Sequence, residues 1–215
     1  MSAWSRSKIW GAEILYPADL NAEFNAGMNA YNAHRTNATI DHPDASITPA
    51  KLDANVSKYT IILIPAGAVF PASNPPELVQ INGTNNSYFV ADFDKATDEK
   101  CDWHFTIPAN WDSGNITAKI KYIANATTGN VMWVVSHKGI SETESIDQAL
   151  TDEAFSADTV DETANNLCIA SKTFALTGIT TGEWVILRLK RDADDAGDTL
   201  DADARLLEIV IEWTI

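Results

Sequence analysis

The clearest pattern in the chain lies near its C-terminus, where two stretches alternate with a period of two. Within residues 183–191, Val185, Leu187 and Leu189 share one face, whereas the opposite face is first apolar and then basic. Within residues 206–215, the apolar face consists of Leu207, Ile209, Ile211, Trp213 and Ile215. Successive side chains of a strand point to opposite faces, so both stretches are predicted to be strands with one buried face.

The same alternation recurs from Tyr59 onwards, where no helical periodicity of useful length interrupts it, although residues 142–155 are ambiguous. The dipeptides Asn82-Gly83 and Gly129-Asn130 are turn signals between apolar runs. Expected strands are residues 59–64, 77–81, 87–93, 102–107, 115–123, 131–137, 167–176, 183–191 and 206–215. About nine strands at this spacing predict a mainly β fold, an antiparallel β-sandwich of the jelly-roll type.

The first 58 residues lack this pattern and are predicted to be an N-terminal anchoring arm in front of a β-sandwich domain of residues 59–215. One short helix is expected at about residues 19–34, with Asp19 as its N-cap, and residues 36–58 are expected to be an extended connector. The helix contains several Asn residues and Gly27, which are poor helix formers, so it needs a partner surface.

Apolar side chains in this arm indicate a contact surface. The predicted helix has one narrow apolar stripe, and an exposed Trp near a chain end is costly unless something covers it. The expected anchoring and interface residues are Trp4, Trp10, Leu20, Phe24, Met28 and Tyr31. The alternative is that the two Trp side chains fold back on their own domain.

Two segments of the arm resemble known proteins. Residues 14–24, which follow an early Trp, and residues 41–52, which include a Ser-Ile-Thr element, resemble N-terminal segments of tailed-phage fibres and other virion appendage proteins. In those proteins a short helix and a Ser-Ile-Thr element precede a β-rich body. The resemblance implies a virion protein, although the Ser-Ile-Thr element occurs once here and many fibres repeat it.

A second resemblance covers the body of the chain. Residues 107–135 and 191–213 resemble a β-sandwich module of phage structural proteins, which runs from an Ile-Pro-x-x-Trp-Asp motif through an Arg-Asp loop to the final strand. The matching residues are Trp111, Gly114, Trp133, Asp198 and Arg205. The resemblance implies a virion context and, together with the narrow helical stripe, a homotrimer. It implies no chemistry.

The formal net charge is −15, and the excess of acid lies in the predicted domain. An acidic body argues against nucleic acid as a partner, because phosphates would be repelled. No apolar run is long enough to span a bilayer, so no membrane insertion is expected. The N-terminus has no apolar signal-peptide core, which predicts synthesis in the host cytoplasm. The two cysteines, Cys101 and Cys168, are expected to be reduced.

The acidic loop 192–203 is the strongest candidate for metal chemistry. Asp192, Asp194, Gly197, Asp198 and Asp203 fall at positions of an EF-hand-like loop. However, the fifth position is Ala and the flanks are predicted strands, so we expect a solvated loop without metal. Asp194→Asn and Asp198→Asn are then expected to be near neutral for stability, with a larger cost for Asp198→Asn if Asp198 pairs with Arg205. The alternatives are a calcium site, or pairing of these carboxylates with Arg191 or Arg205 within one chain or between subunits.

No phosphate-loop, dinucleotide, hydrolase or zinc-protease motif occurs, and the four histidines are scattered. No catalytic residue, metal or cofactor is therefore predicted. These observations favour a non-enzymatic structural component of a tailed-phage virion, a fibre or spike for host attachment that its arm anchors to other virion proteins. The alternatives are a capsid decoration protein, a carbohydrate-binding β-sandwich that reads host-surface glycans and, more weakly, a glycan-degrading enzyme.

Ligand or intersubunit contacts are expected in the loops. In the carbohydrate-binding alternative, exposed aromatic side chains such as Trp111 or Tyr88 stack on sugars. The candidate ligand or intersubunit residues are Trp111, Asp192, Asp194, Asp198 and Arg205.

Overall fold

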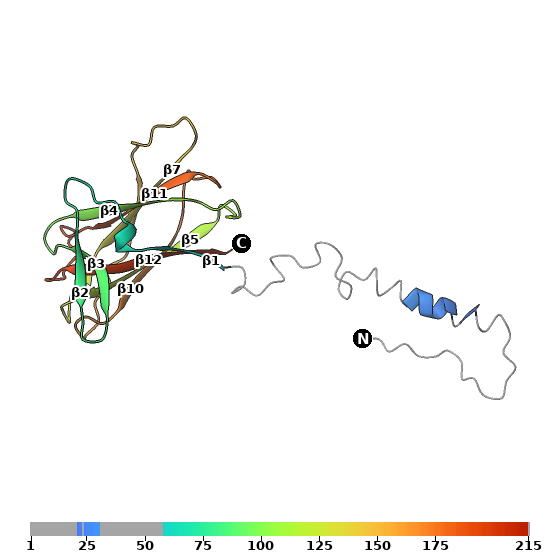
Figure 1. The fold of residues 1–215 in the computed structure, drawn as a ribbon, viewed down its shortest axis with the longest axis horizontal. Helices are drawn as coiled ribbons and strands as arrows, with labels where there is room; N and C mark the ends of the chain where they lie inside the picture. Colours follow the sequence, from blue (N-terminus) through green and yellow to red (C-terminus); the bar gives the residue numbers. More distant parts are fainter. Residues whose placement is uncertain (1–20, 23, 31–57, 215) are drawn as a thin grey trace. The chain divides into compact units, whose positions relative to one another are not determined.

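Two units make up the chain, Met1–Val56 and Ser57–Ile215. The computed structural model describes residues 21, 22, 24–30 and 58–214 (Figure 1). Apart from one short 3-10 turn, the regular secondary structure described in the second unit is all β-strand.

In the first unit, residues 21, 22 and 24–30 are helical and fall within the helix predicted at residues 19–34. Phe24 and Met28 on this helix are 68% and 41% exposed. The predictions for Trp4, Trp10, Leu20 and Tyr31 lie outside the described residues. No helix in the described part of the chain is long and apolar enough to cross a membrane.

The larger sheet of the second unit is organised around β12, the longest strand. β12 pairs with β5 on one edge; on the other edge its start pairs with β3 and its later residues with β1. The order across the sheet is β10-β5-β12-β3-β2, and every pairing is antiparallel. Its strands are β1 (Lys58–Leu63), β2 (Glu77–Asn82), β3 (Ser87–Phe93), β5 (Asn115–Ala124), β10 (Cys168–Ala175) and β12 (Ala204–Thr214).

The smaller sheet faces it and has the order β4-β11-β7-β8, again antiparallel. Its strands are β4 (Glu99–Thr106), β7 (Trp133–Ile140), β8 (Thr151–Ala154) and β11 (Trp184–Arg191). The short strands β6 (Asn130–Val131) and β9 (Asp158–Thr159) pair with each other, and a 3-10 turn, η2, spans Pro65–Gly67. The prediction of an antiparallel β-sandwich is confirmed, and the ambiguous stretch 142–155 is a loop followed by β8.

The core consists of the inward faces predicted from the alternation. The three inward residues expected in β11 have no exposed surface. Trp133 of β7 meets Phe93 and Tyr122 of the larger sheet edge to face, with ring centroids 5.2 Å and 5.5 Å apart. This is a favourable arrangement for aromatic rings, and it joins the two sheets at the centre of the sandwich.

A β-bulge corrects the face predicted for Leu207. The pairing of β12 with β5 shifts between Leu206, opposite Tyr122, and Glu208, opposite Lys121. Leu207 is the extra residue, and it is only half-buried, whereas Leu206 is completely buried. One inserted residue reverses the alternation, so the inward set of β12 includes Leu206 in place of Leu207.

The cysteines lie in different sheets, Cys101 in β4 and Cys168 in β10. Both are buried and free of any disulfide. Burial raises the pKa of both thiols above the usual range, so they remain protonated.

His137 of β7 is a histidine inside the core, with no exposed surface. Its ring stacks on Phe174 of β10, with centroids 5.8 Å apart, and neither ring nitrogen has a hydrogen-bond partner. Burial lowers the pKa of His137 below its usual value, and the carboxylates of Glu153 and Asp152 offset only part of this effect. The neutral imidazole is therefore the buried form, at the cost of two unpaired polar atoms.

Replacement of His137 by Phe is expected to raise the free energy of unfolding by about 1 kcal/mol at neutral pH, because it removes unpaired buried nitrogens and keeps a ring. The gain should widen in acid. Because the folded state depresses the pKa of His137, the stability that the neutral ring provides above about pH 6.5 is lost as the pH falls towards the folded pKa. Urea unfolding of both proteins from about pH 7.5 to about pH 5.5 measures this difference.

The matched control is His104→Gln, which replaces an exposed histidine outside the core and should not reproduce the stability gain of His137→Phe. Equal pH slopes for wild type and His137→Phe would contradict the prediction.

Candidate functional site

The outer face of the smaller sheet carries a row of polar side chains that crosses all four strands. Arg188 of β11 lies opposite Asp102 of β4 on one side and Ser136 of β7 on the other. Ser136 in turn lies opposite Asp152 of β8. The neighbouring positions of β11 point into the core, so the alternation of the strand places this row on the outer side.

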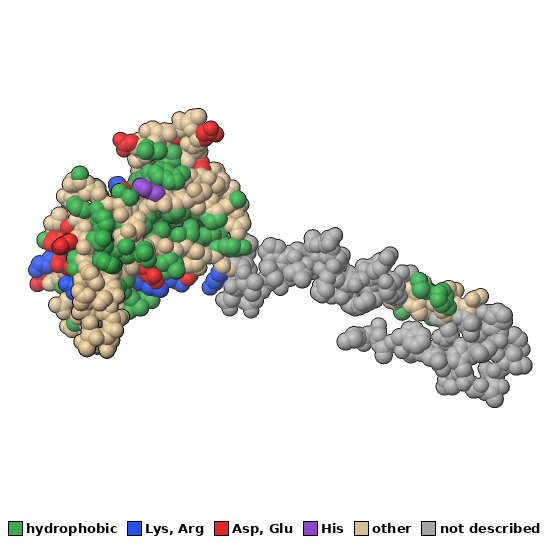
Figure 2. All heavy atoms as spheres, viewed as in Figure 1, with side chains coloured by type: hydrophobic (Ala, Val, Ile, Leu, Met, Phe, Trp, Pro, Cys, Tyr) green, Lys and Arg blue, Asp and Glu red, His purple; other side chains and the backbone are tan. Residues whose placement is uncertain are grey.

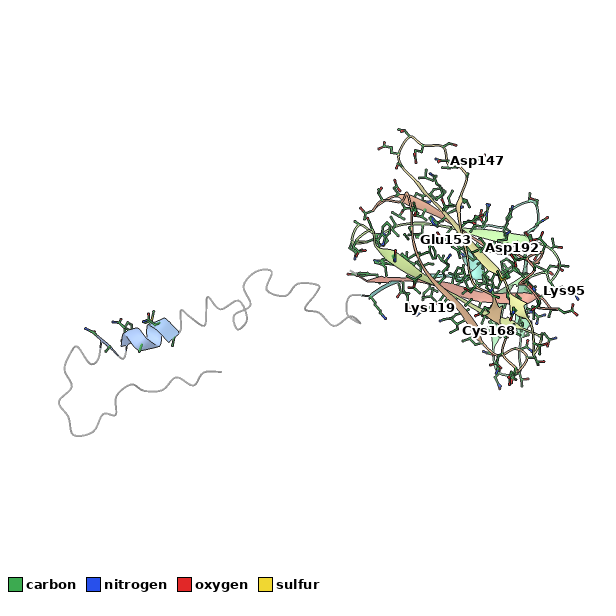
Figure 3. All side chains as sticks on the ribbon, turned by 180° about the vertical axis from the view of Figure 1, so that it is seen from behind. Lys95, Lys119, Asp147, Glu153, Cys168 and Asp192 are labelled. Atoms are coloured by element: carbon green, nitrogen blue, oxygen red, sulfur yellow. The ribbon has the colours of Figure 1, made fainter. Side chains whose placement is uncertain are left out.

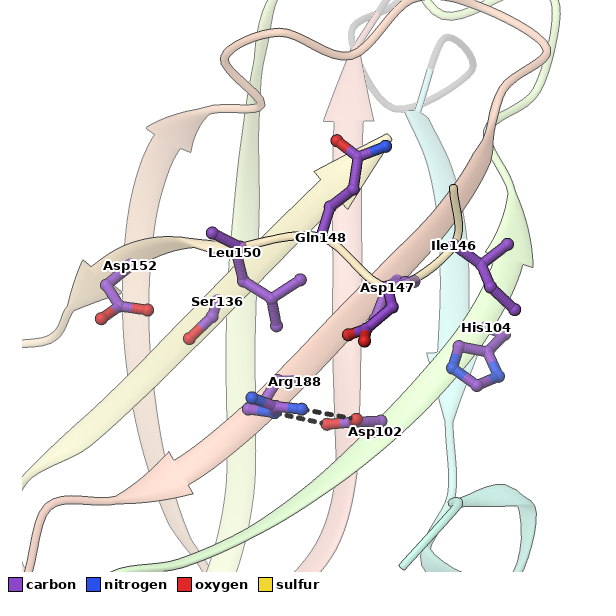
Figure 4. Close-up of a pocket in the computed structure, with 11 residues that line it drawn as sticks. Asp102, His104, Ser136, Ile146, Asp147, Gln148, Leu150, Asp152 and Arg188 are labelled. Atoms are coloured by element: carbon purple, nitrogen blue, oxygen red, sulfur yellow. Dashed lines mark hydrogen bonds and ion pairs between the residues drawn. The ribbon is translucent and has the colours of Figure 1, made fainter. Parts of the chain in front are cut away.

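Asp102 and Arg188 hold each other in a two-bonded ion pair. Arg188 Nε donates to Asp102 Oδ1 at 2.7 Å, and Nη2 donates to Oδ2 at 2.9 Å (Figure 4). The hydrogen bonds with Asp102 raise the pKa of Arg188 above its usual value. The side chains are 29% and 16% exposed for Arg188 and Asp102, so the pair is a fixed polar surface that still reaches solvent.

A loop at residues 141–150 overhangs this ion pair. It connects β7 to β8 and projects from the sandwich, as the position of Asp147 in Figure 3 shows. Within the loop, Gln148 Nε2 donates to the carbonyl oxygen of Ser145 at 2.7 Å. The space between loop and sheet is a pocket of about 420 Å³, within the usual range for small-molecule sites.

The walls of this pocket combine polar and apolar groups. In Figure 4, Asp147 lies above the ion pair and Ile146 lies beside His104. Ile186 and Leu150 add apolar surface. The His104 ring also packs against the ring of Trp184, which lies next to the pocket, with centroids 4.8 Å apart. Figure 2 shows acidic side chains on the projecting loop and a histidine at its base.

The arrangement provides hydrogen-bond donors and acceptors close together. The guanidinium of Arg188 donates, and the carboxylates of Asp102, Asp147 and Asp152 accept. The floor lies on paired strands, which hold side chains more firmly than a loop does. Such a pocket suits a small polar ligand with several hydrogen-bonding groups and a little apolar surface.

Sequence reasoning missed this pocket because its residues come from four strands and one loop. Asp102 and Arg188 are 86 positions apart. The available signal was that each falls on the polar face of a predicted strand. The alternation assigns a face to each residue, but only the pairing of β4 with β11 shows that the two residues meet.

The loop predicted to be solvated, residues 192–203, is folded around a buried arginine. Arg191 has no exposed surface, and its Nε and Nη2 donate to the two carboxylate oxygens of Asp198 at 3.0 Å and 2.8 Å. Its remaining donors reach the carbonyl oxygens of Phe93, Ala202 and Leu200. Five hydrogen bonds use the full donor capacity of the guanidinium.

Asp198 therefore has a different role from the one expected. Its side chain is 1% exposed, and its Oδ2 also accepts from the backbone N–H of Met132 at 3.1 Å. The prediction that Asp198 is a solvated carboxylate is wrong, and the alternative that pairs it with Arg191 is confirmed. Arg205 pairs instead with Asp92, from Nε to Oδ2 at 3.3 Å. This second pairing joins β12 to β3 within one chain.

Only two of the acidic residues in the EF-hand-like pattern lie close together in the structure. Asp192 and Asp194 lie with Asp98, from the loop before β4, so that one oxygen of each falls within 4.8 Å of the others. Lys190 Nζ donates to Asp98 at 3.2 Å and to Asp192 at 2.9 Å. The ammonium of Lys190 thus offsets one of the three negative charges of this cluster. Position seven of an EF-hand loop binds through its backbone carbonyl, so the burial of the Asp198 side chain does not test the calcium alternative.

Trp111 does not offer an exposed ring to a ligand. It is 3% exposed and belongs to the hydrophobic core, so the expectation that it stacks on a sugar is wrong. Polar neighbours in the sequence predict an exposed aromatic residue, but the path of the loop places this side chain in the core. Tyr88, the other aromatic candidate, is half-buried in β3.

No protein-family model matches the chain, and no curated protein matches it. Among solved structures, CBM35 from Cellvibrio japonicus Abf62 is similar to 73% of this chain over 97% of its own length, with 13% identity and a TM-score of 0.46. A Xyl-CBM35 in complex with a glucuronic acid containing disaccharide covers 72% of this chain and 96% of its own, with 12% identity and a TM-score of 0.43.

The enzymatically active domain of bacteriophage CBA120 tailspike protein 4 covers 74% of this chain but only 19% of its own, with 8% identity and a TM-score of 0.38. At these values the three similarities assign no ligand and no partner to this chain.

Asp198→Asn is expected to lower the free energy of unfolding by about 3–5 kcal/mol, because it leaves the buried charge of Arg191 without a counter-charge. Asp194→Asn, in the same loop, is the matched control. Asp194 is exposed, and its change should stay within about 0.5 kcal/mol. Chemical unfolding of the two variants at neutral pH measures both values. Similar midpoints for the two variants would show that the buried pair contributes no more than a surface charge.

Proposed function

We propose that the β-sandwich is a non-catalytic module that binds carbohydrate in the pocket beneath residues 141–150. The observation that carries this proposal is the two-bonded Asp102–Arg188 pair on the pocket floor. It presents a carboxylate and a guanidinium side by side. Adjacent hydroxyl groups of a sugar ring both donate and accept, so they match such a pair.

The same floor favours binding over turnover. Asp102 and Arg188 each use two atoms to hold the other, which supports a role in binding for this pair. The C–H face of a sugar needs apolar surface, which is supplied here by Ile186, Leu150 and the exposed Ile146. The proposal rests on this pocket and not on the similarity to solved carbohydrate-binding modules.

The full chain is expected to bind a subset of neutral oligosaccharides on a glycan array. Arg188→Ala removes donors from the floor, and His104→Ala removes an exposed wall. Each should weaken binding of the best array ligand by about tenfold, the loss of roughly one to two hydrogen bonds. Isothermal titration with that ligand measures the effect.

The control is Glu162→Ala, which removes an exposed residue in the segment between β9 and β10, outside the pocket. It should bind as wild type does. Absence of binding across the array, or unchanged affinity in both pocket variants, would overturn the proposal.

A second function is compatible with the first and is favoured by a different observation. Residues 14–24 and 41–52 resemble anchoring segments of tailed-phage fibres, and they belong to the unit that is separate from the β-sandwich. We therefore also propose that the protein is a homotrimeric virion appendage that displays the sandwich for host attachment. Capsid decoration is the alternative location, and a micrograph of particles labelled for this protein distinguishes the two.

Deletion of residues 1–56 is expected to leave a folded sandwich that no longer enters particles. The reason is that β1 begins at Lys58, after the boundary between the units. Thermal unfolding checks the fold, light scattering checks whether the full chain is a trimer, and immunoblots of purified particles check incorporation. Normal occupancy of the truncated chain on particles would show that the arm is not the anchor.

A further inference from the structure

The pocket contains carboxylates that the protein itself does not neutralise. Asp147 and Asp152 line it, and neither side chain has a hydrogen bond or ion pair within the described residues. Asp102 is the third carboxylate, but its charge is balanced by Arg188. Two of the three carboxylates of the pocket therefore have no Arg or Lys partner among the described residues.

Few cations lie near these carboxylates. Arg188 is the one Arg or Lys side chain that lines the pocket among the described residues. Lys138, one row along β7, lies outside the pocket lining, and it is the smallest of the causes that lower the pKa of Glu183, after the hydrogen bonds of Ser141 and Thr180.

Lys190 lies one row further along β11 on the other side and donates to Asp98 and Asp192. The formal charge of −15 on the whole chain adds a negative field of the same sign as the pocket.

We propose that this pocket selects sugars by charge: it prefers a sugar that carries a free ammonium group, accepts a neutral sugar less well, and rejects a sugar acid. The inference rests on the proposed carbohydrate-binding function. Asp147 and Asp152 are the specificity-determining residues. An ammonium group near them replaces the missing counter-charge, whereas a ligand carboxylate meets only like charges at the pocket walls.

Three methyl glucosides that differ only at carbon 6 test this ranking. They are the 6-amino-6-deoxyglucoside, the glucoside and the glucuronide, which carry positive, no and negative charge. Titration of the full chain at about pH 8 keeps the alkylamine protonated. Nuclear magnetic resonance shifts report affinity. The amino sugar should bind about fivefold more tightly than the glucoside, and the glucuronide should be the weakest.

Two changes that remove charge should weaken the preference for the amino sugar. Asp147→Asn and Asp152→Asn each keep the size of the side chain and remove its charge, so each should reduce the ratio of amino-sugar to glucoside affinity. Added salt should reduce the same ratio, because screening weakens charge interactions and leaves neutral contacts largely intact. Glu162→Gln removes one negative charge from the chain outside the pocket and should leave the ratio unchanged.

The outcomes separate this inference from the function it rests on. Equal affinities for the three glucosides, a preference for the glucuronide, or a ratio that survives in both Asp variants overturns charge selection and leaves carbohydrate binding intact. Equal binding of ethylammonium chloride and the amino sugar overturns it too, because charge would then act without a sugar site. Failure of the amino sugar to bind overturns the inference, whereas failure of the whole array overturns the proposed function.

Discussion

The buried Arg191–Asp198 pair is the interaction on which the rest of the sandwich depends. A charged guanidinium inside a protein is costly unless every donor finds a partner, and Arg191 meets that demand with five hydrogen bonds. Its partners include the carbonyl oxygen of Phe93 at the end of β3 and those of Leu200 and Ala202 just before β12. One side chain thus fixes the path of the loop that connects β11, in the smaller sheet, to β12, in the larger sheet.

The loop closed by this pair also restricts its neighbours. Gly129 has a φ of +110°, and a Cβ there would lie 2.8 Å from the Cα of Leu200. Two reasons therefore require glycine at this position: its backbone conformation and the close approach of the loop. β11 carries a second arginine, Arg188, three positions earlier and on the opposite face. One strand thereby provides both the buried pair that fixes the fold and the solvent-facing pair that forms the pocket floor.

Charge is arranged differently on the two outer faces of the sandwich. On the larger sheet, Lys119 and Lys121 of β5 pair with Glu212 and Glu208 of β12 at 2.7 Å and 2.6 Å (Lys119 is labelled in Figure 3). These pairs are partly exposed, so each contributes only about 0–1 kcal/mol, but they cancel charge across that face. On the smaller sheet, Asp147 and Asp152 have no such partners within the described residues. The contrast leaves the pocket with two carboxylates that pair with no lysine or arginine among the described residues.

The sequence by itself determined the strands, their inward faces and the class of fold, because a period of two is a local property that burial then enforces. All nine predicted strands form, and Leu187 and Ile120 lie in the core as their spacing requires. The spacing did not reveal the bulge at Leu207, since it inserts a residue without changing the composition of the strand.

Only the tertiary structure decided the sites. Asp198 looks like its neighbours in an acidic run. Arg191, however, lies on the inward face of β11, and its guanidinium holds the Asp198 carboxylate in the interior. Asp102 meets Arg188, and Asp98 meets Lys190, across separations that only strand pairing brings together. Alternation specifies the side of a sheet on which a residue lies, whereas register, loop path and the need to satisfy every buried charge specify its partner.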